Sequence, residues 1–158
     1  MQIWIGIDPG LTGAVAWLTV TSKGIKPVVY DCPVLQERAG GKRDYEIAAM
    51  HKLLPTHGTT KVAIEWPSWA GLQGKQAAGS IARSCSIWET LCVVDRLPYH
   101  RIAPHKWKRD MGLQGKNKDA SRAMAMRLWP GLREQLELKK HDGRAEALLL
   151  AEYLRRAG

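Results

Sequence analysis

The stretch that most constrains the fold is an apolar run near the start of the chain, which ends on one carboxylate and then turns on glycines. The run predicts a buried β-strand whose last residue is Asp8, followed by a turn at Pro9 to Gly13. Side chains alternate along a strand, so one face carries Ile3, Ile5 and Ile7 and the other carries Trp4, Gly6 and Asp8. Because Gly6 has no side chain, we expect space for a ligand beside Asp8. An aspartate at a strand end is also a common turn cap, and for Asp8 alone both interpretations stay open.

A second apolar stretch, Thr59 to Glu65, repeats this pattern, with a small residue and then a carboxylate on one face and a proline two residues later. Between the two stretches we expect a helix that Asp44 caps and that runs to about Leu54. Parallel strands joined by a helical crossover are usually neighbours in a sheet. Asp8 and Glu65 are therefore predicted to lie at the same sheet edge.

The remaining patterns complete a single α/β domain over residues 1–158. Further strands are predicted at residues 14–20, 26–32 and 99–103, and further helices at residues 75–94, 117–129 and 140–156. Residues 104–108 are predicted to form a basic loop. A chain of this length buries about 70% of its unfolded surface, so it needs no disulfide or metal to fold. The three cysteines lack CxxC spacing and are interpreted as core residues: Cys32, Cys85 and Cys92.

The chain is strongly basic, with a formal net charge of +9 and a pI near 9.7. Residues 96–127 hold nine Lys or Arg against two Asp, a local +7 that accounts for most of the excess. Seven tryptophans and no phenylalanine accompany these cations, and three of the tryptophans fall in predicted loops, where an indole can stack on bases: Trp66, Trp69 and Trp107. This combination favours nucleic acid as the partner.

Membranes are disfavoured as a partner, because no basic amphipathic helix with a broad apolar face is evident. The chain also shows no long apolar run and no basic leader, so we expect neither a transmembrane helix nor a signal peptide. A cytoplasmic location is the resulting expectation.

Two more acids, Asp142 and Glu146, are four residues apart in the last predicted helix and share a face. Like charges at this spacing destabilise a bare helix, and either a bound cation or the neighbouring Lys140 and Arg144 would offset the repulsion. Two strand-end acids and two helical acids are what a two-metal phosphoryl-transfer site requires, with Mg²⁺ or Mn²⁺ as the ions.

Three segments resemble a known family: IGIDPGLTGAVA, VAIEWP and HDGRAEALLLAEYL, in this order. They are similar to RuvC-type Holliday-junction resolvases of the RNase H-like (retroviral integrase) fold, over nearly the whole chain. The resemblance implies a mixed five-stranded sheet flanked by helices, in which a three-strand antiparallel meander joins parallel strands. It also implies a homodimeric endonuclease of DNA recombination and repair that cuts four-way junctions with Mg²⁺ or Mn²⁺. By resemblance, the metal-binding catalytic acids are Asp8, Glu65, Asp142 and Glu146.

The last motif departs from many bacterial members, in which two acids, or a histidine and an acid, are three residues apart. Here the spacing is four and His141 precedes the pair, which is closer to the diverged phage and organelle branch. A phage protein of this kind would act in the host cytoplasm. Which of His141 and Asp142 touches metal stays open; His141 is predicted to assist, as base or by positioning water.

Junction binding is assigned to residues that follow Glu65 and to a predicted helix start. The family places a loop and helix that engage the junction centre directly after the middle acid, and Lys116 and Lys118 can hold phosphates together with helix N-terminal amides. Each cation taken singly can equally be solvated surface. The full predicted set is Trp66, Trp69, Lys75, Arg83, Lys116 and Lys118. The helix at residues 75–94 is a candidate dimer interface, although its apolar residues could equally face the sheet.

Two other functions fit parts of the sequence. The pattern Asp-x-Gly-x-Thr-Gly at residues 8–13 also opens actin-like and sugar-kinase domains, but that architecture needs two such domains, and no small-molecule cofactor is expected here. A related RNase H-like nuclease acting on RNA or RNA/DNA hybrid, or a non-cleaving junction binder, stays as an alternative. The complete set of acids argues against a pure binder.

Overall fold

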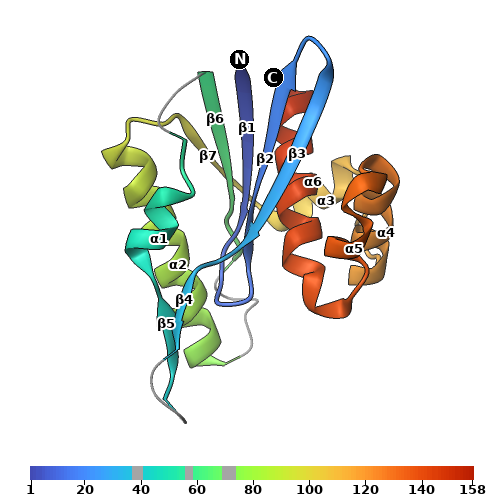
Figure 1. The fold of residues 1–158 in the computed structure, drawn as a ribbon. Coiled ribbons are helices and arrows are strands. Elements are labelled where there is room, and N and C mark those ends of the chain that lie inside the picture. Colours follow the sequence, from blue (N-terminus) through green and yellow to red (C-terminus); the bar gives the residue numbers. More distant parts are fainter. Residues whose placement is uncertain (37–40, 56–58, 69–73) are drawn as a thin grey trace.

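A mixed five-stranded sheet forms the centre of the molecule (Figure 1). The computed structural model describes residues 1–36, 41–55, 59–68 and 74–158. The strand order is β3-β2-β1-β6-β7; β1, β2 and β3 pair antiparallel, whereas β6 is parallel to β1 and β7 is parallel to β6. The strands span Gln2–Asp8 (β1), Ala14–Thr21 (β2), Gly24–Asp31 (β3), Thr59–Glu65 (β6) and Tyr99–Ile102 (β7). The predicted meander with added parallel strands is confirmed.

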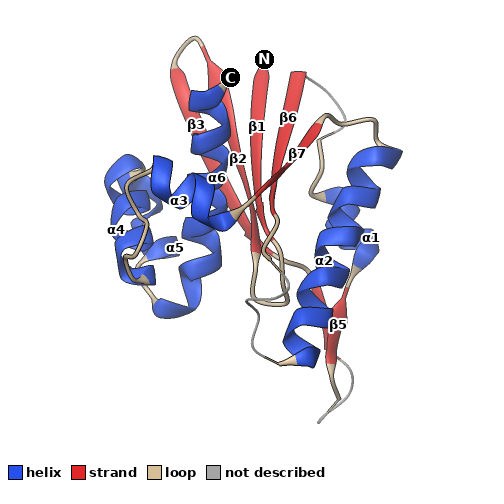
Figure 2. Cartoon of the chain, turned by 180° about the vertical axis from the view of Figure 1, so that it is seen from behind, coloured by secondary structure: helices blue, strands red, loops and turns tan. Residues whose placement is uncertain are grey.

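Helices cover both faces of the sheet, as Figures 1 and 2 show from opposite sides. One face carries α1 (Ile47–Lys52) and α2 (Lys75–Val94). On the other face α6 (Asp142–Ala157) lies against β1 and β2, with three shorter helices beside it: α3 (Pro104–Asp110), α4 (Lys118–Leu128) and α5 (Arg133–Leu136). Two 3₁₀ turns, η2 (Pro130–Leu132) and η3 (Lys139–His141), complete the order.

The first strand is buried on both faces, and its side chains alternate as the sequence predicts. Ile3, Ile5 and Ile7 pack in the core beneath α2, whereas Trp4 packs in the core beneath α6. Full burial of an aliphatic side chain stabilises a fold by about 1.5–3 kcal/mol. β1 is therefore held from both sides, and the position of Asp8 at its end is fixed by this packing.

The room predicted beside Asp8 is present, since Asp8 lines a pocket, but Gly6 does not provide it, because the backbone of α6 fills the space at Gly6. A Cβ built on Gly6 would lie 2.1 Å from the Ala147 carbonyl oxygen and 2.5 Å from the Ala151 amide nitrogen. The glycine thus lets the backbone of α6 lie directly on β1. This close approach brings the first turns of α6, and the acids on them, to the end of β1.

The register of β1 and β6 sets the second part of the site. Ile7 is paired with Ile64, so Asp8 and Glu65 are the next residues along two adjacent parallel strands. Their predicted placement at one sheet edge is confirmed.

The segment between β3 and β6 differs from the prediction. A short hairpin of β4 (Val34–Gln36) and β5 (Arg43–Tyr45) precedes α1, and Asp44 lies in β5 instead of capping the helix. Its carboxylate accepts the Tyr45 amide hydrogen at 2.7 Å and pairs with Arg83. Glu46 stands at the start of α1 without a side-chain capping bond.

The predicted basic loop at residues 104–108 is wrong, because these residues begin α3. Pro104 occupies the first helical turn, where its missing N–H is not needed. Trp107 is fully buried in this helix, so it is not an exposed stacking residue.

Helix α2 has the predicted bounds. Trp88 and Cys92 pack in the core against the sheet, and Cys85 is buried with its Sγ 3.7 Å from the Glu65 carbonyl oxygen of β6. Cys32 is buried as well, so all three cysteines are core residues as predicted. No helix in the described ranges is both long and apolar enough to cross a bilayer. The single-domain organisation stays a prediction.

Candidate active site

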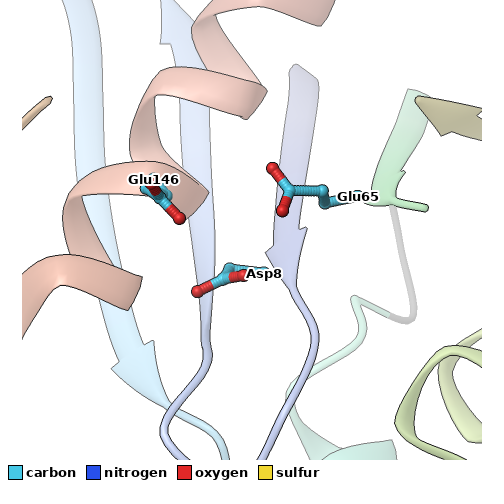
Figure 3. A group of neighbouring side chains, drawn as sticks. All are labelled: Asp8, Glu65 and Glu146. Carbon is cyan, nitrogen blue, oxygen red and sulfur yellow. The ribbon is translucent and has the colours of Figure 1, made fainter. Parts of the chain in front are cut away.

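Three carboxylates converge at the edge of the sheet where β1 and β6 end (Figure 3). Asp8 comes from β1, Glu65 from β6 and Glu146 from the second turn of α6, and one oxygen of each lies within 4.8 Å of the others. Figure 3 shows the three side chains pointing toward one another. The parallel β1–β6 pair and the close approach of α6 over Gly6 together produce this arrangement.

The environment of Asp8 and Glu65 opposes their ionisation. Burial, followed by the charges of Glu65 and Glu146, raises the pKa of Asp8 well above its ordinary value. Burial and the charge of Glu146 likewise raise the pKa of Glu65. Like charges held together out of water are stabilised by a cation between them. The electrostatics therefore favour a metal site.

Lys108 supplies part of the missing positive charge. Its Nζ donates a hydrogen bond to Glu146 Oε1 at 2.9 Å. Burial lowers the pKa of Lys108, but the attraction of Glu146 and Glu65 outweighs this effect and raises it overall. Three carboxylates and one ammonium leave a charge of −2 when all are ionised, which a divalent cation would balance.

A hydrogen bond from α3 orients the middle acid. The Trp107 indole Nε1–H donates to Glu65 Oε2 at 2.7 Å. The bond favours the ionised carboxylate and lowers the pKa of Glu65 against the larger effect of burial. Buried partners of this kind fix metal-binding carboxylates in place.

The donor set fits a hard divalent ion. Carboxylate oxygens are the ligands that Mg²⁺ and Mn²⁺ prefer. The three acids line a pocket of about 640 Å³ together with Lys108 and Lys118. Glu146 is only 5% exposed, whereas the pocket itself is open, so a phosphodiester can approach the acids from outside.

Asp142 lies apart from the three acids. Its Oδ1 is 3.2 Å from Arg122 Nη1, and Arg122 also pairs with Asp119. A Cβ on Gly143 would lie 2.9 Å from Asp8 Oδ2, so the helix position three before Glu146 faces Asp8, and this position is a glycine. The way α6 is rotated on β1 therefore places Gly143, and not Asp142, against Asp8.

His141 also lies outside the group of acids. It is buried, and its Nδ1 accepts the Leu138 amide hydrogen at 3.4 Å. It lines a separate pocket with Asp31 and Arg144. Burial, then the charges of Arg144 and Lys140, lower the pKa of His141, so the ring is neutral at pH 7.

Of the residues predicted to bind nucleic acid, Lys118 reaches the acidic pocket. Arg83 pairs with Asp44 and lies over the Tyr45 ring at 5.8 Å, and Lys75 and Lys116 are exposed. Trp66 is stacked under Arg101, with the guanidinium 4.2 Å from the ring centroid. Trp69 lies outside the described residues.

Sequence reasoning missed the roles of Trp107 and Lys108 because it placed them in a loop. Pro104 was the available signal, since proline is favoured at the first position of a helix. A helix start there places Trp107 and Lys108 in its next turn, facing inward.

Comparison with known proteins finds a relative by sequence and several solved structures by fold, of which two are described. The chloroplastic Holliday junction resolvase MOC1 of Chlamydomonas reinhardtii is 41% identical over 81 residues, which are 48% of this chain and 9% of that protein. The structure of Thermus thermophilus RuvC matches with a TM-score of 0.60 at 16% identity, over 99% of this chain and 96% of that chain. The structure of T. thermophilus RuvC in complex with a Holliday junction substrate matches with a TM-score of 0.59 at 18% identity, over 100% of this chain and 97% of that chain. No protein-family model matches.

These matches confirm the resemblance to RuvC-type resolvases that the motifs indicated. The chain has the RuvC fold, which is RNase H-like, over its whole length. About half of its sequence is similar to a small part of a much longer resolvase.

Proposed function

We propose that this protein is a divalent-metal-dependent endonuclease that resolves four-way (Holliday) DNA junctions. The observation that carries the proposal is the convergence of Asp8, Glu65 and Glu146 at the edge of a RuvC-like sheet. The sequence similarity to a Holliday junction resolvase and the structural similarity to a junction-bound RuvC support the substrate.

In this proposal Asp8, Glu65 and Glu146 hold Mg²⁺ or Mn²⁺, with two ions expected per site. When bound, these ions supply Lewis-acid charge and lower the pKa of water for attack on phosphorus. Trp107 keeps the Glu65 carboxylate in the orientation that ligation needs. Lys108 and Lys118 line the same pocket and offset the repulsion between the three acids and an approaching phosphate.

We also propose roles in metal binding and catalysis for Asp142 and His141. These roles require a rearrangement of the chain where η3 meets α6. The Asp142–Arg122 contact lacks hydrogen-bond geometry, and Asp142 Oδ1 has no hydrogen-bond partner in the described part of the chain. Such a weakly held carboxylate can turn toward a bound ion. His141 would then assist as base or by positioning water.

A homodimer follows from the chemistry proposed. Two symmetric incisions require two acid clusters, and each chain carries one, so two chains related by a two-fold axis are needed. Because Cys85, Trp88 and Cys92 are core residues, the interface would use the outer face of α2 and its neighbours. Light scattering that shows a monomer both alone and on junction DNA would contradict this. We also propose that the protein acts in the cytoplasm.

The function is tested with a panel of labelled substrates: a four-way junction, a duplex and an RNA/DNA hybrid, each with and without Mg²⁺ or Mn²⁺. We expect paired, metal-dependent cuts in the junction and little cutting of the other two. Faster cleavage of the hybrid would favour the alternative of an RNA-directed nuclease. Tight junction binding without cuts under any metal would favour a non-cleaving binder.

A further inference from the structure

Two other pockets adjoin the acidic pocket. One has a volume of about 450 Å³ and the other a volume of about 300 Å³. Leu11 and Arg43 line all three pockets, and Thr12 and Gly13 line both the acidic pocket and the smaller one. The three pockets therefore meet around Arg43 and the turn that follows Asp8.

Arg43 lines these pockets from an anchored hairpin. It belongs to β5, and its side chain is exposed. Two residues later, the Tyr45 hydroxyl donates to the Ser80 carbonyl oxygen of α2 at 2.9 Å. The neighbouring Asp44 pairs with Arg83 of α2. These contacts hold the hairpin against α2 and keep the Arg43 guanidinium beside the acidic site.

The smaller pocket is rich in cations, and part of this charge is unpaired. Arg144 is occupied, since it donates to both carboxylate oxygens of Asp31 at 2.6 and 2.7 Å. Arg43 and Lys140 form no ion pair within the described ranges. The Thr12 side chain and the backbone of Gly13 add polar groups to the same wall. The pocket thus presents a net positive charge directly beside three carboxylates.

We propose that Arg43 and Lys140 bind a backbone phosphate of the DNA strand that is cut, next to the phosphate at the acids. A strand whose phosphate lies at the acids passes next to the smaller pocket, because Leu11, Thr12, Gly13 and Arg43 line both pockets. Its phosphates are repelled by the acids and attracted by cations beyond them. The inference rests on the proposed function and adds the place where the cut strand is held.

The test uses the full chain with Glu65→Gln, which stops cutting, and a labelled four-way junction in which single phosphates are replaced by neutral methylphosphonates. Lys140→Ala is compared with Lys139→Ala, which removes the adjacent exposed lysine that lines none of the three pockets. Arg43→Ala is compared with Arg133→Ala in the same way. Lys140→Gln serves as a second variant if Lys140→Ala alters the circular dichroism spectrum.

We expect Lys140→Ala and Arg43→Ala each to weaken junction binding on the order of tenfold, as for a lost charge-assisted hydrogen bond. Each should also flatten the dependence of log K on log salt by up to about 0.9. At one position within a few nucleotides of the cut, a methylphosphonate should weaken junction binding by the Glu65→Gln protein. The same methylphosphonate should have little further effect on binding when Lys140→Ala or Arg43→Ala is also present. The Lys139→Ala and Arg133→Ala controls should keep the full methylphosphonate effect.

The inference is overturned if no scanned phosphate shows this coupling, or if Lys139→Ala behaves like Lys140→Ala. Either result would make the pocket part of a general basic surface. Failure of the proposed function has a different signature, because the protein with its native Glu65 would then neither bind nor cut the junction selectively.

Discussion

Trp107 Nε1 donates a hydrogen bond to Glu65 Oε2 at 2.7 Å, which joins a fully buried indole of α3 to the acid at the end of β6. The indole packs on the α6 side of the sheet, so the bond links the core to the site. It holds the Glu65 carboxylate in place and leaves Oε1 free of this bond. Helix α3 is thus a support for the site.

Trp107→Phe should lower the affinity of the site for Mg²⁺ strongly and the stability of the fold only slightly. Phenylalanine keeps most of the apolar packing and removes the donor, and loss of such a partner costs roughly 10- to 100-fold in metal affinity or activity. Unfolding should become easier by only about 1 kcal/mol. The measurement is the single-turnover cleavage rate of a four-way junction against Mg²⁺ concentration, alongside thermal melting.

Trp88→Phe is the matched control, because Trp88 is equally buried and its Nε1 has no hydrogen-bond partner in the described part of the chain. It should change stability and leave the Mg²⁺ dependence as it was. An unchanged Mg²⁺ dependence in Trp107→Phe would mean that the bond does not serve the site.

Removing one acid should stabilise the metal-free protein at high pH. The folded state raises the pKa of Asp8 and Glu65, so it binds their protons more tightly than the unfolded chain does. Their stabilising contribution is full below the ordinary carboxyl pKa and is lost as pH rises through the raised value. An amide does not ionise and so loses no stability as pH rises. The melting temperature of Asp8→Asn should therefore be higher than that of the parent at pH 8, and the two melting temperatures should converge near pH 4.

Thermal melting of both proteins in the presence of a chelator checks this prediction. In a chain of this size, each kcal/mol of stability shifts the melting temperature by about 2–4 °C. Added Mg²⁺ should raise the melting temperature of the parent and much less that of Asp8→Asn. Glu134→Gln, an exposed site, should follow the parent throughout. A variant that melts below the parent at pH 8 without metal would contradict the electrostatic account.

Gly6→Ala should disturb the site through the packing of α6. The added Cβ would meet backbone atoms of Ala147 and Ala151 that cannot move without shifting the helix. Overpacking of this kind costs typically about 1–3 kcal/mol. Gly131→Ala is the control, since nothing lies within 4 Å of its Cβ position and it lines none of the three pockets. Thermal melting and cleavage should both fall in Gly6→Ala and stay near the parent in Gly131→Ala.

Asp142→Asn and Glu146→Gln should differ in their effect on metal binding. Calorimetric titration with Mn²⁺ should show a loss of more than about tenfold for Glu146→Gln and less than about threefold for Asp142→Asn, if Asp142 stays with Arg122. Equal losses would mean that Asp142 leaves Arg122 and joins the ion. In that case, the four-acid site implied by the motif would be correct.

The sequence predicted the parts of the fold that depend on local periodicity. Alternation along residues 3–8 identified both faces of β1, and the repeated pattern at Glu65 identified its parallel neighbour. The position of Asp142 was not predictable in this way, because it depends on how α6 is rotated where it docks on Gly6. A rotation by one residue decides whether position 142 or 143 faces Asp8.

Other parts of the site depend on contacts between segments far apart in the sequence. Trp107 acquires its role only when α3 packs against the end of β6, 42 residues earlier in the chain. Arg43 acquires its position from a hairpin of two three-residue strands, which are too short to show a period. Single side chains in such elements carry no pattern of their own.

The most direct test of the central claim is single-turnover cleavage of a labelled four-way junction at saturating protein, comparing Glu146→Gln with Glu134→Gln. Both variants exchange one carboxylate for an amide, one inside the acid cluster and one on the exposed surface. We predict a fall of roughly 10³-fold or more for Glu146→Gln, from the loss of several kcal/mol of transition-state stabilisation, with junction binding retained. Glu134→Gln should cut at the parent rate. Cleavage by Glu146→Gln at a rate near that of Glu134→Gln would contradict the assignment of this cluster as the catalytic site.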